Sequence, residues 1–245
     1  MPAPESIDDA RGRRIVAVFF DAGGTLLREE PPRVEIYREA AARRGIDVPA
    51  PYLRDLMYRT HAELPRSIGE HFRYSHGWFR TFITRIFRDH LGCPTSALEA
   101  IQNELLTRFA DPRTFRLLPG AADLVRELHD RGVVVGVVSN WSESLPALLD
   151  GLGLTKHLDF VLVSAIEHCE KPEPEIFLRA LAKAGVEASQ ALHVGDDRER
   201  DVQGARTVGI LPVLVRCAPA TEHGHDTHEF DDLIELRPWI LERLR

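Results

Sequence analysis

Five short apolar runs, rich in β-branched residues, are spread along the chain: Ile15–Phe20, Val133–Val138, Phe160–Val163, Ala191–Val194 and Leu211–Val215. Continuous apolar runs of this length are typical of strands buried on both faces of a parallel sheet. Segments of helical length, such as Pro119–Arg131 and Pro174–Ala184, alternate with the later runs. The pattern predicts an α/β fold with a parallel sheet in the order 3-2-1-4-5. Pro212 in the last run favours an edge position for that strand.

The first two runs are separated by more residues than a crossover connection needs. Apolar residues in this insert recur at helical spacing on three amphipathic segments: Val34, Tyr37 and Ala41; Phe79, Phe82, Ile83, Ile86, Phe87 and Leu91; Leu98, Ile101, Leu105 and Phe109. An insert that leaves the sheet just after the first strand can act as a lid. We therefore predict a discontinuous core, residues 1–27 and 113–245, and a helical cap, residues 28–112.

Composition and charge limit the classes of partner. The net charge of −7 argues against nucleic acid or an anionic membrane surface, because both attract basic proteins. No apolar run is long enough to span a membrane, and the first residues lack the apolar core of a secretory signal, so we expect a cytoplasmic protein. The chain has three widely spaced cysteines, Cys93, Cys169 and Cys217, and we predict that they are reduced thiols. The sequence does not indicate an oligomeric state.

Polar residues follow four of the predicted strands. They are Asp21, the pair Ser139-Asn140, Lys171 in the loop after the third strand, and the pair Asp196-Asp197. Ligands of open α/β sheets bind at the carboxyl ends of the strands, where the strand order reverses. We therefore expect these chain-distant residues to meet at one place.

The residue types indicate phosphate chemistry. Two neighbouring carboxylates, Asp21 and Asp196, resist joint ionisation unless a cation lies between them, and Mg²⁺ prefers such oxygen ligands. Lys171 adds a positive charge and Ser139 a hydroxyl donor, so Asp21 can act as a nucleophile toward phosphorus. The Gly23 carbonyl is a further candidate metal ligand. The amides of Ala22 and Gly23 are candidates for holding phosphoryl oxygens.

Each of these stretches also has an ordinary structural interpretation. Ser139-Asn140 is a possible helix cap, and Lys171-Pro172-Glu173-Pro174 is a possible helix entry. Asp196, Asp197 and Asp201 would each favour the N-terminal end of a helix dipole. The functional interpretation depends on all four stretches occurring in order at successive strand ends.

The stretches "FFDAGGTLL", "VVSN", "EKPEPEIF" and "HVGDDRERDVQGAR" resemble motifs I to IV of the haloacid dehalogenase-like hydrolases. The position of the insert is similar to subfamily I, which has a helical C1 cap. The resemblance implies a Rossmann-like core, Mg²⁺ and phosphoryl transfer through an aspartyl intermediate. By position, Asp21 matches the nucleophile, while Ser139, with its neighbour Asn140, and Lys171 match the phosphate contacts. Asp196 matches the metal ligand, and Asp201 and its neighbour Asp197 match outer-shell acids.

The chain departs from the family pattern at two positions. Phosphatases of the family carry a second Asp where this chain has Gly23, and that acid protonates the leaving group; such help contributes about 10²–10⁴-fold. His168 stands where many relatives have Gly. His61, His71 and His76 are candidates to replace the missing acid, since histidine titrates near neutrality.

Three functions remain open from the sequence. The first is a Mg²⁺-dependent phosphatase acting on a small phosphorylated metabolite, weak on alkyl phosphates. The second is a non-catalytic protein that binds a phospho-ligand or a partner. The third, 2-haloacid dehalogenation, is disfavoured because those enzymes use no metal and a different motif IV. A group of haloacid dehalogenase-like domain-containing proteins with D-x-x-G-T-L and a Trp-bearing cap helix, here near Trp78, is most similar.

The remaining histidines have structural interpretations. His193 lies in the fourth strand and is predicted to be a core residue. His223, His225 and His228 are predicted to lie in a solvated polar loop, although zinc binding is conceivable. Short helical turns, interrupted at Pro238, are expected from Asp232 onward.

Overall fold

The computed structural model describes residues 14–216 and 227–244. Cys217, His223 and His225 lie outside the described residues. The chain forms two compact units: the first contains the described parts of residues 1–28, 117–140 and 152–245, and the second contains residues 29–116 and 141–151. Among the described residues, the structure holds no helix with the length and apolar character needed to cross a bilayer.

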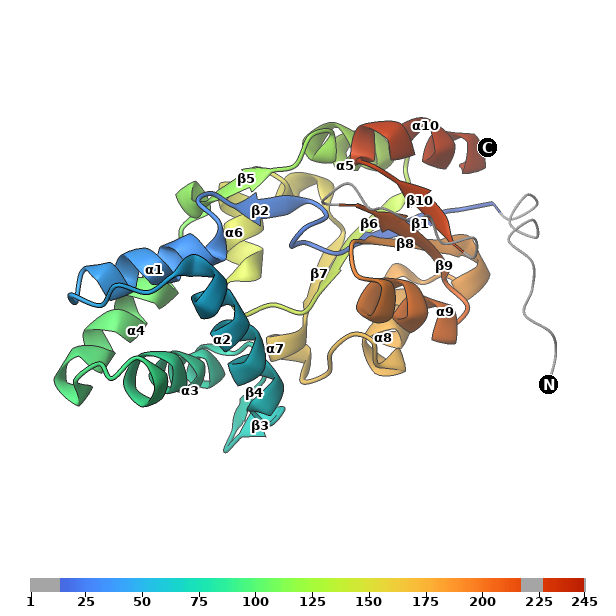
Figure 1. Cartoon of the computed structure of the whole chain (residues 1–245). Coiled ribbons are helices and arrows are strands. Elements are labelled where there is room, and N and C mark those ends of the chain that lie inside the picture. Colours follow the sequence, from blue (N-terminus) through green and yellow to red (C-terminus); the bar gives the residue numbers. More distant parts are fainter. Residues whose placement is uncertain (1–13, 217–226, 245) are drawn as a thin grey trace. The chain divides into compact units, whose positions relative to one another are not determined.

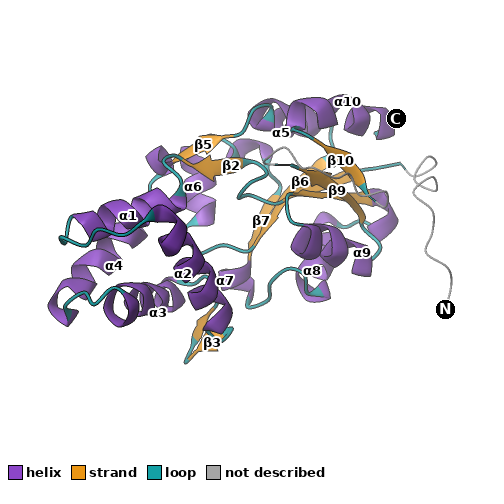
Figure 2. Ribbon diagram, viewed as in Figure 1, coloured by secondary structure: helices purple, strands orange, loops and turns teal. Residues whose placement is uncertain are grey.

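The first unit is built on a six-stranded sheet in which every pair of neighbours is parallel. Its order is β10-β9-β8-β1-β6-β7 (Figures 1 and 2). The strands are β1 (Ala17–Phe20), β6 (Val134–Ser139), β7 (Phe160–Val163), β8 (Ala191–Gly195), β9 (Leu211–Val215) and β10 (His228–Phe230). The α/β class is therefore confirmed.

Helices cover both faces of this sheet (Figure 2). They are α5 (Ala121–Asp130), α7 (Ser164–Glu167), α8 (Pro174–Ala184), α9 (Gly204–Thr207) and α10 (Leu233–Arg243). Helices α5 and α10 pack together, whereas α8 packs through Ile176 and Phe177 on a cluster that includes Phe19 of β1. The central strands, buried on both faces, are apolar for that reason.

Three expectations about the C-terminal part are wrong. The strand with Pro212 is not at the edge, because β10 pairs with β9; that pairing begins at Val213, one residue after the proline. His228 lies in β10 rather than in a polar loop. Helix α10 runs through Pro238 without interruption, since Leu236 and Ile240 on either side of it are fully buried.

The second unit is helical. Its helices are α1 (Arg33–Ala42), α2 (Ala50–Glu63), α3 (His76–Thr84) with a π-helical continuation (Arg85–His90), α4 (Thr95–Ala110) and α6 (Leu145–Gly151). A short hairpin, β3 (Ser67–Ile68) and β4 (His71–Phe72), precedes α3. The core of this unit contains Tyr37, Trp78, Phe82 and Phe87, with Trp78 and Phe82 stacked at 5.6 Å between ring centroids.

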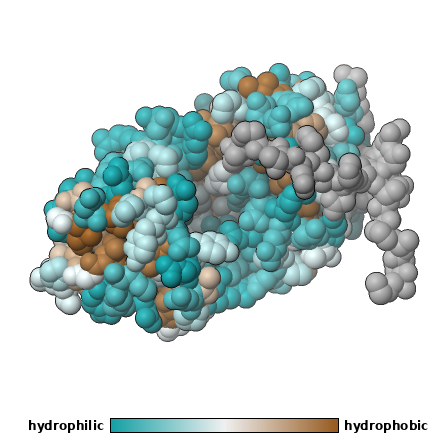
Figure 3. Space-filling view, in the orientation of Figure 1, coloured by the Kyte–Doolittle hydropathy of each residue, from teal (hydrophilic) through white to brown (hydrophobic). Residues whose placement is uncertain are grey.

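Two short strands, β2 (Leu27–Glu29) and β5 (Phe115–Leu117), pair with each other where the chain passes between the units. On the face shown in Figure 3 the surface of each unit is mostly hydrophilic, and an apolar area gathers on the helical unit. A role of residues 28–112 as a cap stays a prediction.

Candidate active site

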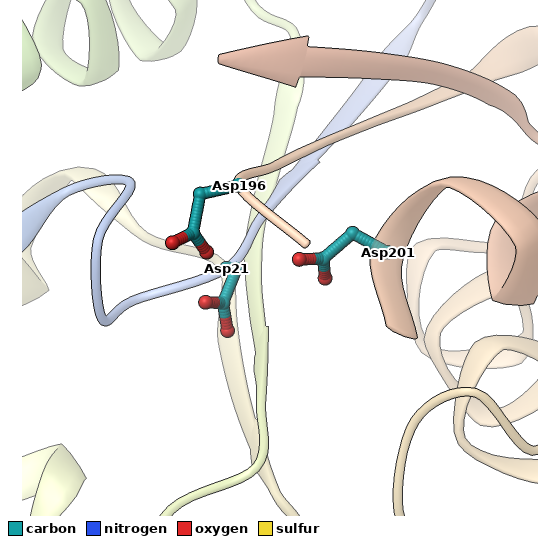
Figure 4. Close-up of side chains that lie close together, drawn as sticks. All are labelled: Asp21, Asp196 and Asp201. Carbon is teal, nitrogen blue, oxygen red and sulfur yellow. The ribbon is translucent and has the colours of Figure 1, made fainter. Parts of the chain in front are cut away.

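The register of the central strands brings Asp21 and Asp196 together. Phe20, the last residue of β1, lies beside Val194 of β8, and the Asp21 amide donates a hydrogen bond to the Val194 carbonyl over 2.8 Å. Asp196 follows β8 immediately. Figure 4 shows the carboxyl groups of Asp21, Asp196 and Asp201 gathered at this end of the sheet. One ligand atom from each lies within 4.8 Å of the other two.

Lys171 supplies the positive charge of this cluster. Its Nζ atom donates a hydrogen bond over 2.7 Å to Oδ1 of Asp21 and a second one to Oδ1 of Asp201. The Lys171 side chain is only 2% exposed. Burial alone would lower the pKa of Lys171, but the charges of Asp201 and Asp21 outweigh it and raise that pKa above its usual value. The two carboxylates therefore favour the ammonium form of Lys171.

Both carboxylate oxygens of Asp201 form hydrogen bonds with other residues. Oδ1 accepts from Lys171 and lies 2.9 Å from Nε2 of His193, and Oδ2 accepts from the Asp197 amide over 3.1 Å. Burial opposes ionisation here, but Lys171 and His193 outweigh it and lower the pKa of Asp201 below its usual range. These contacts favour the ionised form of Asp201 and fix the orientation of its carboxylate.

The two other carboxyl groups resist ionisation. Burial raises the pKa of Asp21, with Lys171 acting against the rise and Asp201 adding to it. Asp196 is accessible to solvent, yet desolvation by the atoms around it and the charges of Asp21 and Asp201 raise its pKa to about 7. These shifts reflect burial in the first place and the neighbouring negative charges in the second.

Gly24 explains how Asp196 comes so close to the motif I loop. Gly24 has φ +80°, and a Cβ atom there would lie 2.2 Å from Oδ2 of Asp196. Glycine is required on both counts, because other residues rarely adopt this backbone conformation and any side chain would displace the carboxylate. Gly23, by contrast, is not among the glycines of positive φ.

The loops after β6 and β7 are tied to each other. The Asn140 side chain donates to the Lys171 carbonyl over 2.9 Å and accepts from the Lys171 amide over 2.8 Å. Ser139 is buried and its side chain forms a hydrogen bond with Asp21. Asn140 thus positions the Lys171 backbone. The predicted phosphate contacts of Ser139 and Asn140 stay predictions, as do those of Ala22 and Gly23.

Asp197 has a structural role in this loop. Its carboxylate accepts hydrogen bonds from the amides of Glu199 and Arg200, which caps the π-helical segment Arg198–Gln203. Its predicted outer-shell role stays a prediction. His168 adopts φ 55°, the left-handed conformation that glycine adopts without strain.

One of the histidines considered above lies in the core of the first unit, and the three candidate proton donors lie in the helical unit. His193 is a buried core residue, as predicted, but its hydrogen bond to Asp201, eight positions further on, was not predicted. His61 packs in the helical unit at 5.4 Å from the rings of Tyr74 and Trp78. His71 and His76 are exposed in the same unit. Their predicted role as proton donors stays a prediction.

The residues present fit a divalent cation. Asp21, Asp196 and Asp201 can supply three negative charges, and Lys171 supplies one positive charge. Burial lowers the pKa of His193, so its ring adds no charge. Carboxylate oxygens are the donors that Mg²⁺ prefers, and one or two of them suffice. The three-aspartate cluster could therefore hold a metal ion that balances the remaining charge.

Comparison with known proteins gives a consistent result. Residues 15–209 match the family model described as haloacid dehalogenase-like hydrolase. The chain is 34% identical over 200 residues to haloacid dehalogenase-like hydrolase domain-containing protein 3 of Bos taurus, covering 80% of each chain. It is 31% identical to ribulose-1,5-bisphosphate 5-phosphatase of Halopiger xanaduensis, covering 81% of this chain and 83% of that one. The crystal structure of a HAD phosphatase from Thermococcus onnurineus superposes with a TM-score of 0.65 at 26% identity, covering 92% of this chain and 98% of that chain.

Proposed function

The chain belongs to the haloacid dehalogenase-like hydrolases, and we propose that it is a Mg²⁺-dependent phosphatase in which Asp21 is the nucleophile. One observation carries the proposal: the Asp21 carboxyl lies 2.7 Å from the Lys171 ammonium, and one of its oxygens lies within 4.8 Å of a carboxylate oxygen of Asp196. A nucleophile, a fixed cation and a candidate metal ligand thus share one place. The phosphatase names of two similar proteins support the same reaction class.

The residues divide the work between them. Asp21 attacks phosphorus, an oxygen–phosphorus bond forms on its carboxylate, and the bond to the leaving group breaks. Water then hydrolyses the aspartyl-phosphate, which restores Asp21 and releases inorganic phosphate. Lys171 stabilises negative charge on the phosphoryl oxygens, and Ser139 and the Ala22 and Gly23 amides are proposed to donate to them. Asp21 and Asp196, with the Gly23 carbonyl, would hold Mg²⁺, which supplies further charge stabilisation when bound.

The substrate class follows from the missing acid. Gly23 has no side chain, so it cannot protonate a leaving group as a carboxylic acid would. The leaving groups of aryl phosphates and acyl phosphates need little protonation, whereas the alkoxide leaving group of an alkyl phosphate has to be protonated. We propose a small metabolite of the first kind as the substrate.

The test is Mg²⁺-dependent hydrolysis of p-nitrophenyl phosphate and acetyl phosphate. Wild type is compared with Asp21→Asn and with Asp130→Asn, which changes an exposed aspartate at the end of α5. The proposal expects turnover in wild type and Asp130→Asn and none in Asp21→Asn. Equal background rates in all three folded proteins would contradict it and favour a protein that binds a phospho-ligand without turning it over.

A further inference from the structure

His193 is a polar residue in the middle of an apolar strand. Its neighbours in β8, Leu192 and Val194, are fully buried, and so is the imidazole ring itself. The ring meets Phe177 of α8 edge-on at 5.2 Å between centroids. Its Nδ1 atom is buried without a hydrogen-bond partner among the described residues. A buried polar atom without a partner weakens a fold, so an apolar side chain would suit the packing better.

What distinguishes the imidazole from an apolar ring is its other nitrogen. Nε2 lies 2.9 Å from Oδ1 of Asp201. An ionised carboxylate only accepts hydrogen bonds, so Nε2 must carry the proton and donate it. The same Oδ1 accepts from Lys171, and Oδ2 accepts from the Asp197 amide. Three donors therefore fix the Asp201 carboxylate, and His193 is the one that comes from the sheet.

We infer that His193 is a positioning residue: its Nε2–H orients Asp201, and Asp201 in turn directs the Lys171 ammonium onto Asp21. The Asp201 oxygen is shared between two donors, which moderates its attraction for Lys171. Without His193, the whole attraction of that oxygen would act on Lys171, and the carboxylate would lose one of the contacts that prevent its rotation. The ammonium would then move away from Asp21 and from the phosphoryl group. The catalytic consequence rests on the proposed phosphatase function, but the geometric consequence does not.

Two variants of His193 separate the donor from the ring. His193→Phe keeps an aromatic ring and removes the donor, whereas His193→Gln keeps an N–H group near the position of Nε2. Phe177→Leu is the matched control, because it disturbs the packing of the same ring and leaves the hydrogen bond in place. Each protein is assayed for kcat and KM with p-nitrophenyl phosphate. The Lys171 ammonium is followed separately by ¹⁵N NMR, with Lys171→Met used to assign its signal.

A displacement of reacting groups by about 1 Å costs about 100-fold in rate, so His193→Phe should lower kcat by about 10- to 100-fold with little change in KM. Its Lys171 signal should shift, whereas His193→Gln and Phe177→Leu should retain most of the activity and the wild-type signal. An unchanged signal and kcat in His193→Phe would overturn the inference, as would equal effects of Phe177→Leu. If wild type shows no turnover, the proposed function fails, and the NMR signal alone decides the inference.

Discussion

The Nζ atom of Lys171 lies 2.7 Å from Oδ1 of Asp21, although the two residues are 150 positions apart in the chain. The parallel sheet produces this contact, because Asp21 directly follows β1 and Lys171 lies between α7 and α8, in the segment that follows β7. Both side chains are almost completely withdrawn from solvent, at 2% and 11% exposure. A buried charge pair affects the stability of the fold as well as the reactivity of the site.

Replacing Lys171 by Met should therefore destabilise the fold. Removing one partner of a buried pair leaves uncompensated charge and costs about 3–5 kcal/mol, here because Asp21 and Asp201 both lose their cation. Urea unfolding of wild type and variant measures the loss. Lys183→Met, at an exposed position in α8, should change stability by less than about 0.5 kcal/mol. Equal effects of the two substitutions would show that the buried pair contributes nothing.

Asp196→Asn should have opposite effects with and without Mg²⁺. In metal-free protein it removes one of three crowded carboxyl groups, so the melting temperature should rise. With Mg²⁺ at about 100 times its Kd, wild type should gain about 2.7 kcal/mol, or roughly 5–10 °C for a chain of this size. The variant should lose most of that gain. Thermal melts at several Mg²⁺ concentrations test both effects, and full Mg²⁺ stabilisation of the variant would exclude Asp196 as a ligand.

Gly24→Ala should lower the affinity for Mg²⁺, because it forces the Asp196 carboxylate to move. Its Cβ would lie 2.2 Å from the Asp196 carboxylate, and its φ of +80° is strained for alanine. Gly209→Ala is matched in strain, with φ +83°, but its nearest neighbour is the Ala188 Cβ at 3.6 Å. Each substitution should cost about 1–3 kcal/mol in stability. Only Gly24→Ala should reduce Mg²⁺ affinity in calorimetric titration, and an equal loss in Gly209→Ala would contradict the assignment.

Gly23→Asp should supply the missing general acid. Gly23 is not among the positive-φ glycines, so aspartate at this position requires no strained backbone. Turnover of an alkyl phosphate should rise, within the roughly 10²–10⁴-fold that general acid catalysis provides, while turnover of acetyl phosphate should change little. Steady-state assays on both substrates measure the ratio. A folded, Mg²⁺-binding variant with an unchanged ratio would contradict the proposed role of the missing side chain.

Much of the fold could be predicted because the central strands are apolar on both faces. Runs such as Ala191–Val194 cannot be exposed, and alternation with helices leaves a parallel sheet as the arrangement. The contact of Asp21 with Lys171 and its approach to Asp196 then follow, since parallel strands end at the same edge. The motifs that resemble the haloacid dehalogenase-like hydrolases lie at these strand ends, and the match to the family model confirms the family.

Features that depend on tertiary contacts could not be predicted in this way. Strand β10 has only three residues, which is too short for a clear sequence pattern. Its Glu229 forms ion pairs with Arg198 and Arg216, and no local pattern in the sequence predicts these contacts. The uninterrupted helix through Pro238 depends on the burial of Leu236 and Ile240. The hydrogen bond of His193 to Asp201 depends on how the chain turns after β8. An isolated histidine in an apolar strand was the available signal.

Phosphorylation of Asp21 is the step on which the proposed function depends, and it can be tested by trapping the intermediate. The protein is mixed with acetyl phosphate and Mg²⁺, quenched in acid, reduced with borohydride and analysed by peptide mass spectrometry. An aspartyl-phosphate on Asp21 would be reduced to homoserine at that position, and omission of Mg²⁺ or the Asp21→Asn substitution should abolish the product. Turnover of acetyl phosphate without any modification of Asp21, or with modification of another carboxylate, would show that Asp21 is not the nucleophile.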